Sequence, residues 1–169
     1  MKYFTIFLAV ILISSCSMKI VPLKGNYNTP TEYYSARSVD EVWESIIDLF
    51  AKNGLPIKII DKNSGLIAAG REYSKATTED NNGNLVDTNA LFVSAKMINP
   101  ANYRVIDNIY VTSDWNIRIK KTEKGTYIGV NLFINRVEYL DQMSPIYHPY
   151  KGLAKSTGKL ERMVAELVR

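Results

Sequence analysis

The sequence has only one cysteine, Cys16, and only one histidine, His148, among its 169 residues. A lone cysteine cannot form a disulfide within the chain, and it cannot supply the paired thiolates of a zinc or redox site. A lone histidine leaves serine and threonine nucleophiles with a single customary base. The sequence therefore indicates no catalytic residue, and we expect neither a metal ion nor another cofactor.

Other motifs that carry chemistry are missing too. There is no glycine-rich phosphate loop and no His-Glu-x-x-His arrangement. The polar stretch 75–88 contains Asp80-Asn81-Asn82-Gly83-Asn84, which lacks the ligand spacing of a calcium-binding EF-hand. We interpret this stretch as a solvated loop. A two-carboxylate site of the glycosidase kind stays open as an alternative, since its members meet in space rather than in sequence.

The sequence also lacks a strong excess of charge of either sign. The formal net charge is +4, and the sequence has no basic run and no arginine-rich helix. Nucleic-acid binding normally needs such a basic surface, so we expect no nucleic-acid partner. With 46% hydrophobic and 22% charged residues, the composition is that of an ordinary single globular domain.

The N-terminus is different in character. Lys2 precedes an apolar run, Tyr3–Ile13, and small residues follow it. The run is shorter than the roughly 20 residues that span a bilayer, and it has the length of a signal-peptide core. Residues 1–15 are therefore predicted to be a signal peptide.

The end of this segment, Ile13-Ser14-Ser15-Cys16, resembles the lipobox of bacterial lipoproteins. The resemblance implies cleavage between Ser15 and Cys16, a diacylglycerol thioether on Cys16, and an N-acyl chain such as palmitate. The bilayer would then be a partner through acylated Cys16. An ordinary secretory signal with an incidental cysteine is the alternative.

The same resemblance bears on location. Ser17, rather than an aspartate, follows Cys16, which in lipoproteins of enteric-type bacteria favours the outer membrane. We therefore expect a lipid-anchored protein of the bacterial cell envelope that faces the periplasm. Residues 16–31 are punctuated by proline, glycine and asparagine and show no periodicity, which is typical of a tether.

A helix followed by a hairpin is predicted from Ser38 to Arg71. Ser38 and Glu41 form a capping box at the start of the helix, and Gly54 stands where a left-handed C-terminal cap is needed. A turn at 61–65 separates two short apolar runs. The apolar residues at helical spacing are Val42, Trp43, Ile46, Ile47, Leu49 and Phe50.

A long antiparallel hairpin is predicted from the alternation of apolar and polar residues in Tyr110–Lys121 and Thr126–Val137. The alternation of apolar and polar residues shifts by one position near Asn135-Arg136-Val137, which indicates a bulge. Residues 90–98 are predicted to form a strand. Lys155–Arg169 is predicted to be a second amphipathic helix, capped by Ser156 or Thr157.

These elements define the expected fold class. We predict a single α+β domain over residues 32–169, with an antiparallel sheet of about five or six strands and two amphipathic helices packed on one face. Trp43 and Trp115 are expected in its core.

The segment 38–71 is also similar to the domains of small envelope lipoproteins, component C of the outer-membrane β-barrel assembly machine among them. The similarity rests on Val42-Trp43, Gly54-Leu55-Pro56-Ile57 and Asp61–Ile67. It implies an α+β domain and an accessory binding role, and it transfers no functional residue.

The aromatic, proline-bearing connection 141–152 supplies the candidate contact residues. Tyr147, His148 and Tyr150 lie between two elements expected to be rigid, and tyrosine is enriched among binding hot spots. We therefore predict an envelope lipoprotein with a non-catalytic binding or accessory role and an envelope protein as partner. An envelope hydrolase with a carboxylate-based site and a passive structural tether are the alternatives.

Overall fold

The structure is a computed structural model that describes residues 18–100, 102–141 and 144–169. The predictions for Ser15, Cys16 and the rest of the signal segment lie outside the described residues. In chain order the elements are β1 (Lys19–Val21), β2 (Glu32–Ser35), α2 (Val39–Lys52), β3 (Ile57–Asp61), β4 (Leu66–Lys75), β5 (Phe92–Ser94), β6 (Lys96–Ile98), β7 (Val105–Ile106), β8 (Ile109–Thr122), β9 (Gly125–Leu140), β10 (Tyr147–Pro149), β11 (Ala154–Ser156) and α3 (Lys159–Leu167).

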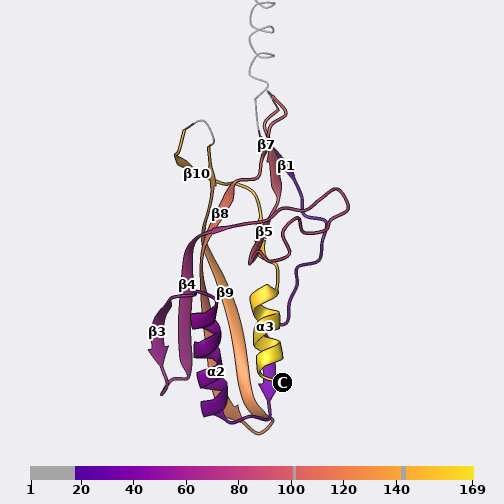
Figure 1. Cartoon of the computed structure of the whole chain (residues 1–169). Helices are drawn as coiled ribbons and strands as arrows, with labels where there is room; N and C mark the ends of the chain where they lie inside the picture. Colours follow the sequence, from indigo (N-terminus) through magenta and orange to yellow (C-terminus); the bar gives the residue numbers. More distant parts are fainter. Residues whose placement is uncertain (1–17, 101, 142–143) are drawn as a thin grey trace, which may run out of the picture.

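The protein has an α+β fold, as predicted. Six strands form the main antiparallel sheet in the order β10-β9-β8-β4-β3, and β2 also pairs with β9. β9 is long enough to pair with β2 near its start and with β10 near its end. Small sheets β1-β6-β7 and β11-β5 complete the fold, and Figure 1 shows them at the end of the molecule away from the β8–β9 turn.

Helix α2 forms as the sequence predicts. Ser38 and Glu41 make the complete capping box, in which each side chain accepts from the backbone N–H of the other residue. Gly54 has a φ of +60°, the left-handed conformation that glycine adopts at little cost after a helix. The residues that the helix buries are Val42, Trp43, Ile46, Leu49 and Phe50.

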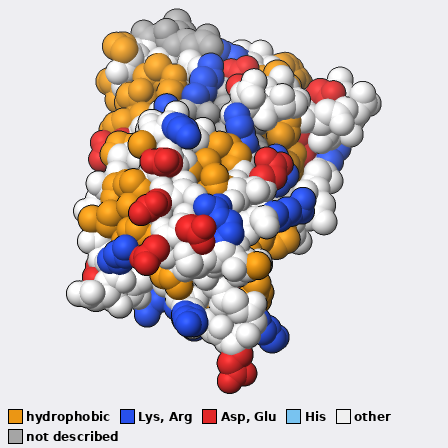
Figure 2. All heavy atoms as spheres, turned by 60° about the horizontal axis from the view of Figure 1, so that its bottom comes forward, with side chains coloured by type: hydrophobic (Ala, Val, Ile, Leu, Met, Phe, Trp, Pro, Cys, Tyr) orange, Lys and Arg blue, Asp and Glu red, His pale blue; other side chains and the backbone are white. Residues whose placement is uncertain are grey.

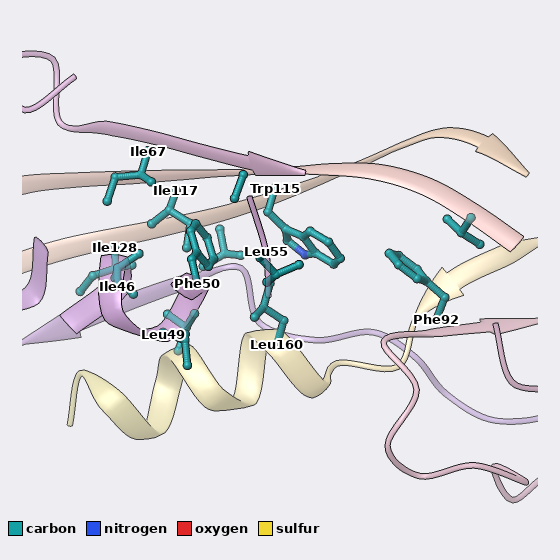
Figure 3. Packing of buried hydrophobic residues seen from close by; sticks show 14 of the residues in the cluster. Ile46, Leu49, Phe50, Leu55, Ile67, Phe92, Trp115, Ile117, Ile128 and Leu160 are labelled. Carbon is teal, nitrogen blue, oxygen red and sulfur yellow. The ribbon is translucent and has the colours of Figure 1, made fainter. Parts of the chain in front are cut away.

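The core lies between this helix, α3 and one face of the sheet. Trp115 from β8 is completely buried, and Trp43 exposes only 4% of its surface, so both tryptophans are core residues as expected. Figure 3 shows Trp115 pointing towards Phe92, with the rings 5.3 Å apart, and Leu160 of α3 on the same side of the strands.

The bulge predicted in the long hairpin is also present. Thr112 pairs with Arg136 and Ser113 pairs with Ile134, so Asn135 is the extra residue of β9. Such a bulge bends a strand, here in the second half of β9.

The tether prediction is wrong for the described part of 16–31. Residues Lys19–Val21 form β1 and pair with β6. Further on, the Glu79 carboxylate accepts hydrogen bonds from the backbone N–H groups of Lys24 and Gly25 and from the Tyr27 hydroxyl. A three-residue strand has too short a pattern to be recognised without its partner, which comes from residues 96–98.

The prediction of a solvated loop at 75–88 is wrong at its beginning. Ala76, Thr77, Thr78 and Glu79 are buried. Thr77 forms a bridge with Val93, and its hydroxyl accepts from the backbone N–H of Asp87. Polar side chains that bind the backbone of their own domain look the same in sequence as solvated ones.

Two further elements differ from the prediction. Helix α3 begins at Lys159, after Gly158 with a φ of +77° and no side-chain cap, because residues Ala154–Ser156 pair with β5 instead. Residues 90–98 form two short strands rather than one, since β5 and β6 belong to different sheets.

Candidate functional site

One face of the main sheet is not covered by either helix. The outward positions of β8 on this face range from intermediate to exposed, whereas the alternate positions pack into the core. We call this surface the open face. It includes Tyr34, Lys58, Tyr73, Tyr110, Asp114, Lys120, Tyr127, Phe133, Asn135 and Tyr147.

Three tyrosines from three strands meet at one end of the open face. The Tyr147 ring of β10 lies 5.0 Å from the ring of Tyr73 in β4 and 5.4 Å from the ring of Tyr110 in β8. Tyr73 and Tyr147 remain exposed to solvent. We call this group the tyrosine cluster. It offers a large aromatic area whose hydroxyl groups are available for hydrogen bonds.

The backbone of β4 is distorted at the tyrosine cluster. The register between β4 and β8 shifts between Arg71 and Ser74, and Tyr73 has a φ of +52°. A positive φ costs a bulky residue of order 1–3 kcal/mol and is concentrated at functional positions. In this conformation the ring of Tyr73 packs against the ring of Tyr147.

A polar ladder crosses the middle of the open face. The Lys58 ammonium donates to one oxygen of Asp114 at 2.7 Å, and the Asn135 amide donates to the other at 2.7 Å. The hydrogen bond from Lys58 lowers the pKa of the Asp114 carboxyl, with a further contribution from Asn135, against a smaller opposing effect of burial. The ladder therefore holds an ionised carboxylate, already paired, on the surface.

A second aromatic pair lies near the β8–β9 turn. The rings of Tyr34 and Tyr127 are 5.6 Å apart in an edge-to-face arrangement. Lys120 lies over the Tyr127 ring at 5.0 Å, and Lys124 lies over the Tyr34 ring at 5.8 Å. Between this pair and the tyrosine cluster, Phe133 is exposed on β9.

The three predicted contact residues do not share a surface. Tyr147 joins the tyrosine cluster on the open face. His148 points to the other face of β10 and stacks on Tyr139 with the rings 5.2 Å apart. Tyr150 is 7% exposed and donates to the carbonyl of Ala95, and burial raises its pKa to about 12.

Two parts of the contact prediction therefore change. Tyr150 is a core residue, since its ring and hydroxyl are both occupied by the domain itself. The segment is also not an irregular connection, because Tyr147–Pro149 pair with β9, and strand alternation sends neighbouring side chains to opposite faces.

Among the described residues, the buried carboxylates are those of Glu79 and Glu161. Glu79 lines a concavity of about 230 Å³ together with Ser94 and Lys96. Burial opposes its ionisation, but the hydrogen bonds from Lys24, Tyr27 and Gly25 outweigh this and lower its pKa. An ionised carboxylate with both oxygens engaged is a structural clamp rather than an acid catalyst. Among residues 18–100, 102–141 and 144–169, no group of three His, Cys, Asp or Glu side chains is placed to hold a metal ion.

Charges of both signs are mixed on the face of the molecule that Figure 2 shows. Figure 2 brings forward the lower end of the molecule in Figure 1, and acidic and basic side chains are interspersed there. Hydrophobic side chains form separate patches between them. Within the described residues, no helix is long and apolar enough to cross a membrane.

Comparison with known proteins gives no further guidance on this surface. A scan against protein-family models found no family that matches the chain, and a search of curated proteins found no match either.

Sequence reasoning found Tyr147 but missed Tyr73, Tyr110 and Phe133. Tyr110 and Phe133 could have been identified, because they occupy the polar-facing positions of strongly alternating strands. Tyr73 gave no such signal, since its position depends on a bulge that appears only when β4 is paired with β8.

Proposed function

We propose that this protein is a lipid-anchored envelope protein that binds a protein partner through the open face of its sheet. The observation that carries the proposal is the tyrosine cluster, in which Tyr73, Tyr110 and Tyr147 gather from three strands on a face that no helix covers. The anchor is Cys16, whose acylation is inferred from its resemblance to the lipobox cysteine.

The physical case for binding is that the aromatic rings are exposed yet held by rigid elements. Tyr110 lies in a fourteen-residue strand, and Tyr147 lies in a strand paired with β9. Such side chains lose little conformational entropy when a partner covers them, and tyrosine is over-represented among residues that dominate binding energy. Lys75 and Glu138 are the register partners of Tyr110, so charges of both signs lie beside the cluster, which suits a protein surface better than a polyanion.

The alternative functions have less support. An envelope hydrolase would need a free acid and base in a cleft, whereas Glu79 is clamped and Asp114 is paired. A passive tether gives no reason for a strained tyrosine at the surface, because a glycine at position 73 would adopt the same positive φ without strain.

The proposal is tested by site-specific photo-crosslinking in intact envelopes. A photoreactive amino acid replaces Tyr147 or Phe133 on the open face, and Glu44 on the exposed side of α2 serves as the matched control. We expect a discrete crosslinked species from the two open-face positions and none from position 44. Equal crosslinking at all three positions, or none at either open-face position, would contradict the proposal. Cys16→Ser should separately move the protein from the membrane fraction to the soluble fraction, because the acyl chains are its proposed anchor.

A further inference from the structure

We infer that the end of the domain formed by β1 and the β6–β7 hairpin is a membrane-contacting surface that rests on the headgroup region of the bilayer. Met18, Ile20, Tyr103 and Val105 lie at this end, with Lys19 and Arg104 beside them, and we call this group the basal rim. Ile20 and Val105 lie on opposite faces of the small sheet, so the group surrounds the end of the sheet rather than one face. The inference rests on the proposed acylation of Cys16.

The pairing of the small sheet places the start of the described chain beside the hairpin tip. Lys19 is opposite Ile98, and Ile98 is opposite Val105. The residues that precede β1 therefore leave the domain on the same side as the turn between β6 and β7. Figure 1 shows this turn at the top of the molecule, where the chain enters β1.

The link between the domain and the proposed anchor is very short. Met18 is only two positions after Cys16, and an extended chain reaches at most about 3.6 Å per residue. The Cα atom of Met18 would thus stay within about 7 Å of the acylated residue. With the acyl chains in the bilayer, the end of the domain that carries Met18 has to lie against the headgroups.

The composition of the basal rim suits this environment. Met18, Ile20 and Val105 are exposed apolar residues, and Tyr103 at the hairpin tip is 83% exposed. Tyrosine rings prefer the membrane–water interface, and lysine and arginine can reach from apolar surface to charged headgroups. In water alone, this concentration of exposed apolar side chains on one small sheet would be unfavourable.

Tyr103 supplies a second and independent indication. It has a φ of +55°, and only Tyr73 shares this property among the non-glycine residues that the structure describes. A strained tyrosine with almost no contact to its own domain is costly to keep. Insertion into the headgroup region gives its ring an environment that the domain does not provide.

The single native cysteine makes a direct test possible. In the full-length lipidated protein the sulfur of Cys16 carries the lipid, so a cysteine introduced by Tyr103→Cys is the only free thiol for a fluorescent label. Val105→Cys provides a second rim position in case the first variant folds poorly. Glu123→Cys in the β8–β9 turn, at the opposite end of the molecule, is the matched control.

Each labelled protein is reconstituted into vesicles of phosphatidylethanolamine and phosphatidylglycerol that contain brominated acyl chains. We expect the labels at 103 and 105 to lose most of their fluorescence, and the label at 123 to keep it. Equal fluorescence at both ends of a membrane-bound protein would overturn the inference while leaving the anchor intact. So would a rim label that is shielded from an aqueous quencher but not reached by the brominated lipid, since a second protein surface would then cover the rim. If the protein does not bind vesicles, and mass spectrometry finds Cys16 unmodified, the proposed anchoring fails and the inference fails with it.

Discussion

Lys58 reaches Asp114 by crossing directly over Gly70, the residue that separates them in the sheet. The ammonium and carboxylate groups are 2.7 Å apart, although they belong to β3 and β8 with β4 between them. A Cβ atom at position 70 would meet both the Asp114 carboxylate and the end of the Lys58 side chain. The absence of a side chain at Gly70 is therefore what allows the polar ladder to form.

Gly70→Ala should displace Lys58 and lower the free energy of unfolding by about 1–3 kcal/mol, the usual cost of crowding a well-packed site. Chemical denaturation measures this change. Lys58→Ala is the matched control, because it removes the ion pair without adding an atom at position 70. Both partners are partly exposed and screened by solvent, so the control should cost less than about 1 kcal/mol. Equal losses in the two variants would show that crowding at Gly70 is not the cause.

Glu79→Gln should release the segment around Lys24 and Gly25 from the body of the domain. The neutral amide offers only one acceptor oxygen, whereas the carboxylate accepts from two backbone N–H groups and the Tyr27 hydroxyl. We expect faster hydrogen exchange at the Lys24 and Gly25 amides, with little change in the core strand β8. Unchanged exchange at these amides would show that β1 alone holds the segment.

The same clamp gives a pH dependence. The pKa of Glu79 is lowered in the folded protein, so folding favours its ionised form. Its contribution is fully present above the pKa of the unfolded chain and is lost as pH falls through the lower folded pKa. The exchange of the Lys24 and Gly25 amides, corrected for its intrinsic pH dependence, should accelerate only in that acidic range. Acceleration near neutral pH instead would point to a different titrating group.

Trp43→Ala should lower the free energy of unfolding by about 3–5 kcal/mol, because the ring is buried between α2 and the sheet. This is a large part of the stability of a domain of this size. Thermal unfolding followed by circular dichroism measures the effect. A melting temperature equal to that of the parent protein would mean that Trp43 is not packed as described.

Ser113→Ala should be neutral or slightly stabilising. The hydroxyl group is completely buried and makes no hydrogen bond to the described part of the protein, so its removal loses no partner. Thr126→Val is the contrasting variant, because the Thr126 hydroxyl donates to the Arg37 carbonyl at 2.7 Å. We expect this second change to cost about 1–3 kcal/mol. A loss of the same size for Ser113→Ala would indicate a partner for its hydroxyl.

Much of the fold could be predicted because its main elements carry strong local signals. The α2 capping box, the left-handed Gly54 and the alternation in β8 and β9 each reflect an interaction within a few residues in sequence. The bulge at Asn135 could also be predicted, since an extra residue shifts the alternation of apolar and polar residues by one position.

The short strands could not be predicted for the opposite reason. β1, β10 and β11 have three residues each. The partners of β1 and β11 lie far away along the chain, whereas β10 pairs with the nearby end of β9. The tether prediction is wrong because Lys19–Val21 form β1. The last helix was predicted to start at Lys155, but Ala154–Ser156 form β11 instead. Pairing with another strand decides these segments, and periodicity over three residues cannot reveal it.

The candidate site was predicted only in part. Tyr147 was recognised as an aromatic residue in a promising connection, but Tyr150 in the same connection is part of the core. The distinction depends on the register of β10 with β9, which turns one side chain to the open face and leaves the other against Ala95. The strained Tyr73 was not predicted, because its conformation arises from the β4 bulge.

The most direct test of the central claim is to remove the exposed rings of the tyrosine cluster and measure folding and partner capture together. Tyr73→Ala/Tyr147→Ala should leave the circular dichroism spectrum and the melting temperature close to those of the parent protein, because both rings are exposed. Crosslinking from position 133 in envelopes should then lose the species that the parent protein forms. Tyr150→Phe is the control, since it changes a tyrosine that the partner does not reach, and crosslinking should persist. Full crosslinking by the folded double variant would contradict the claim that the open face binds the partner.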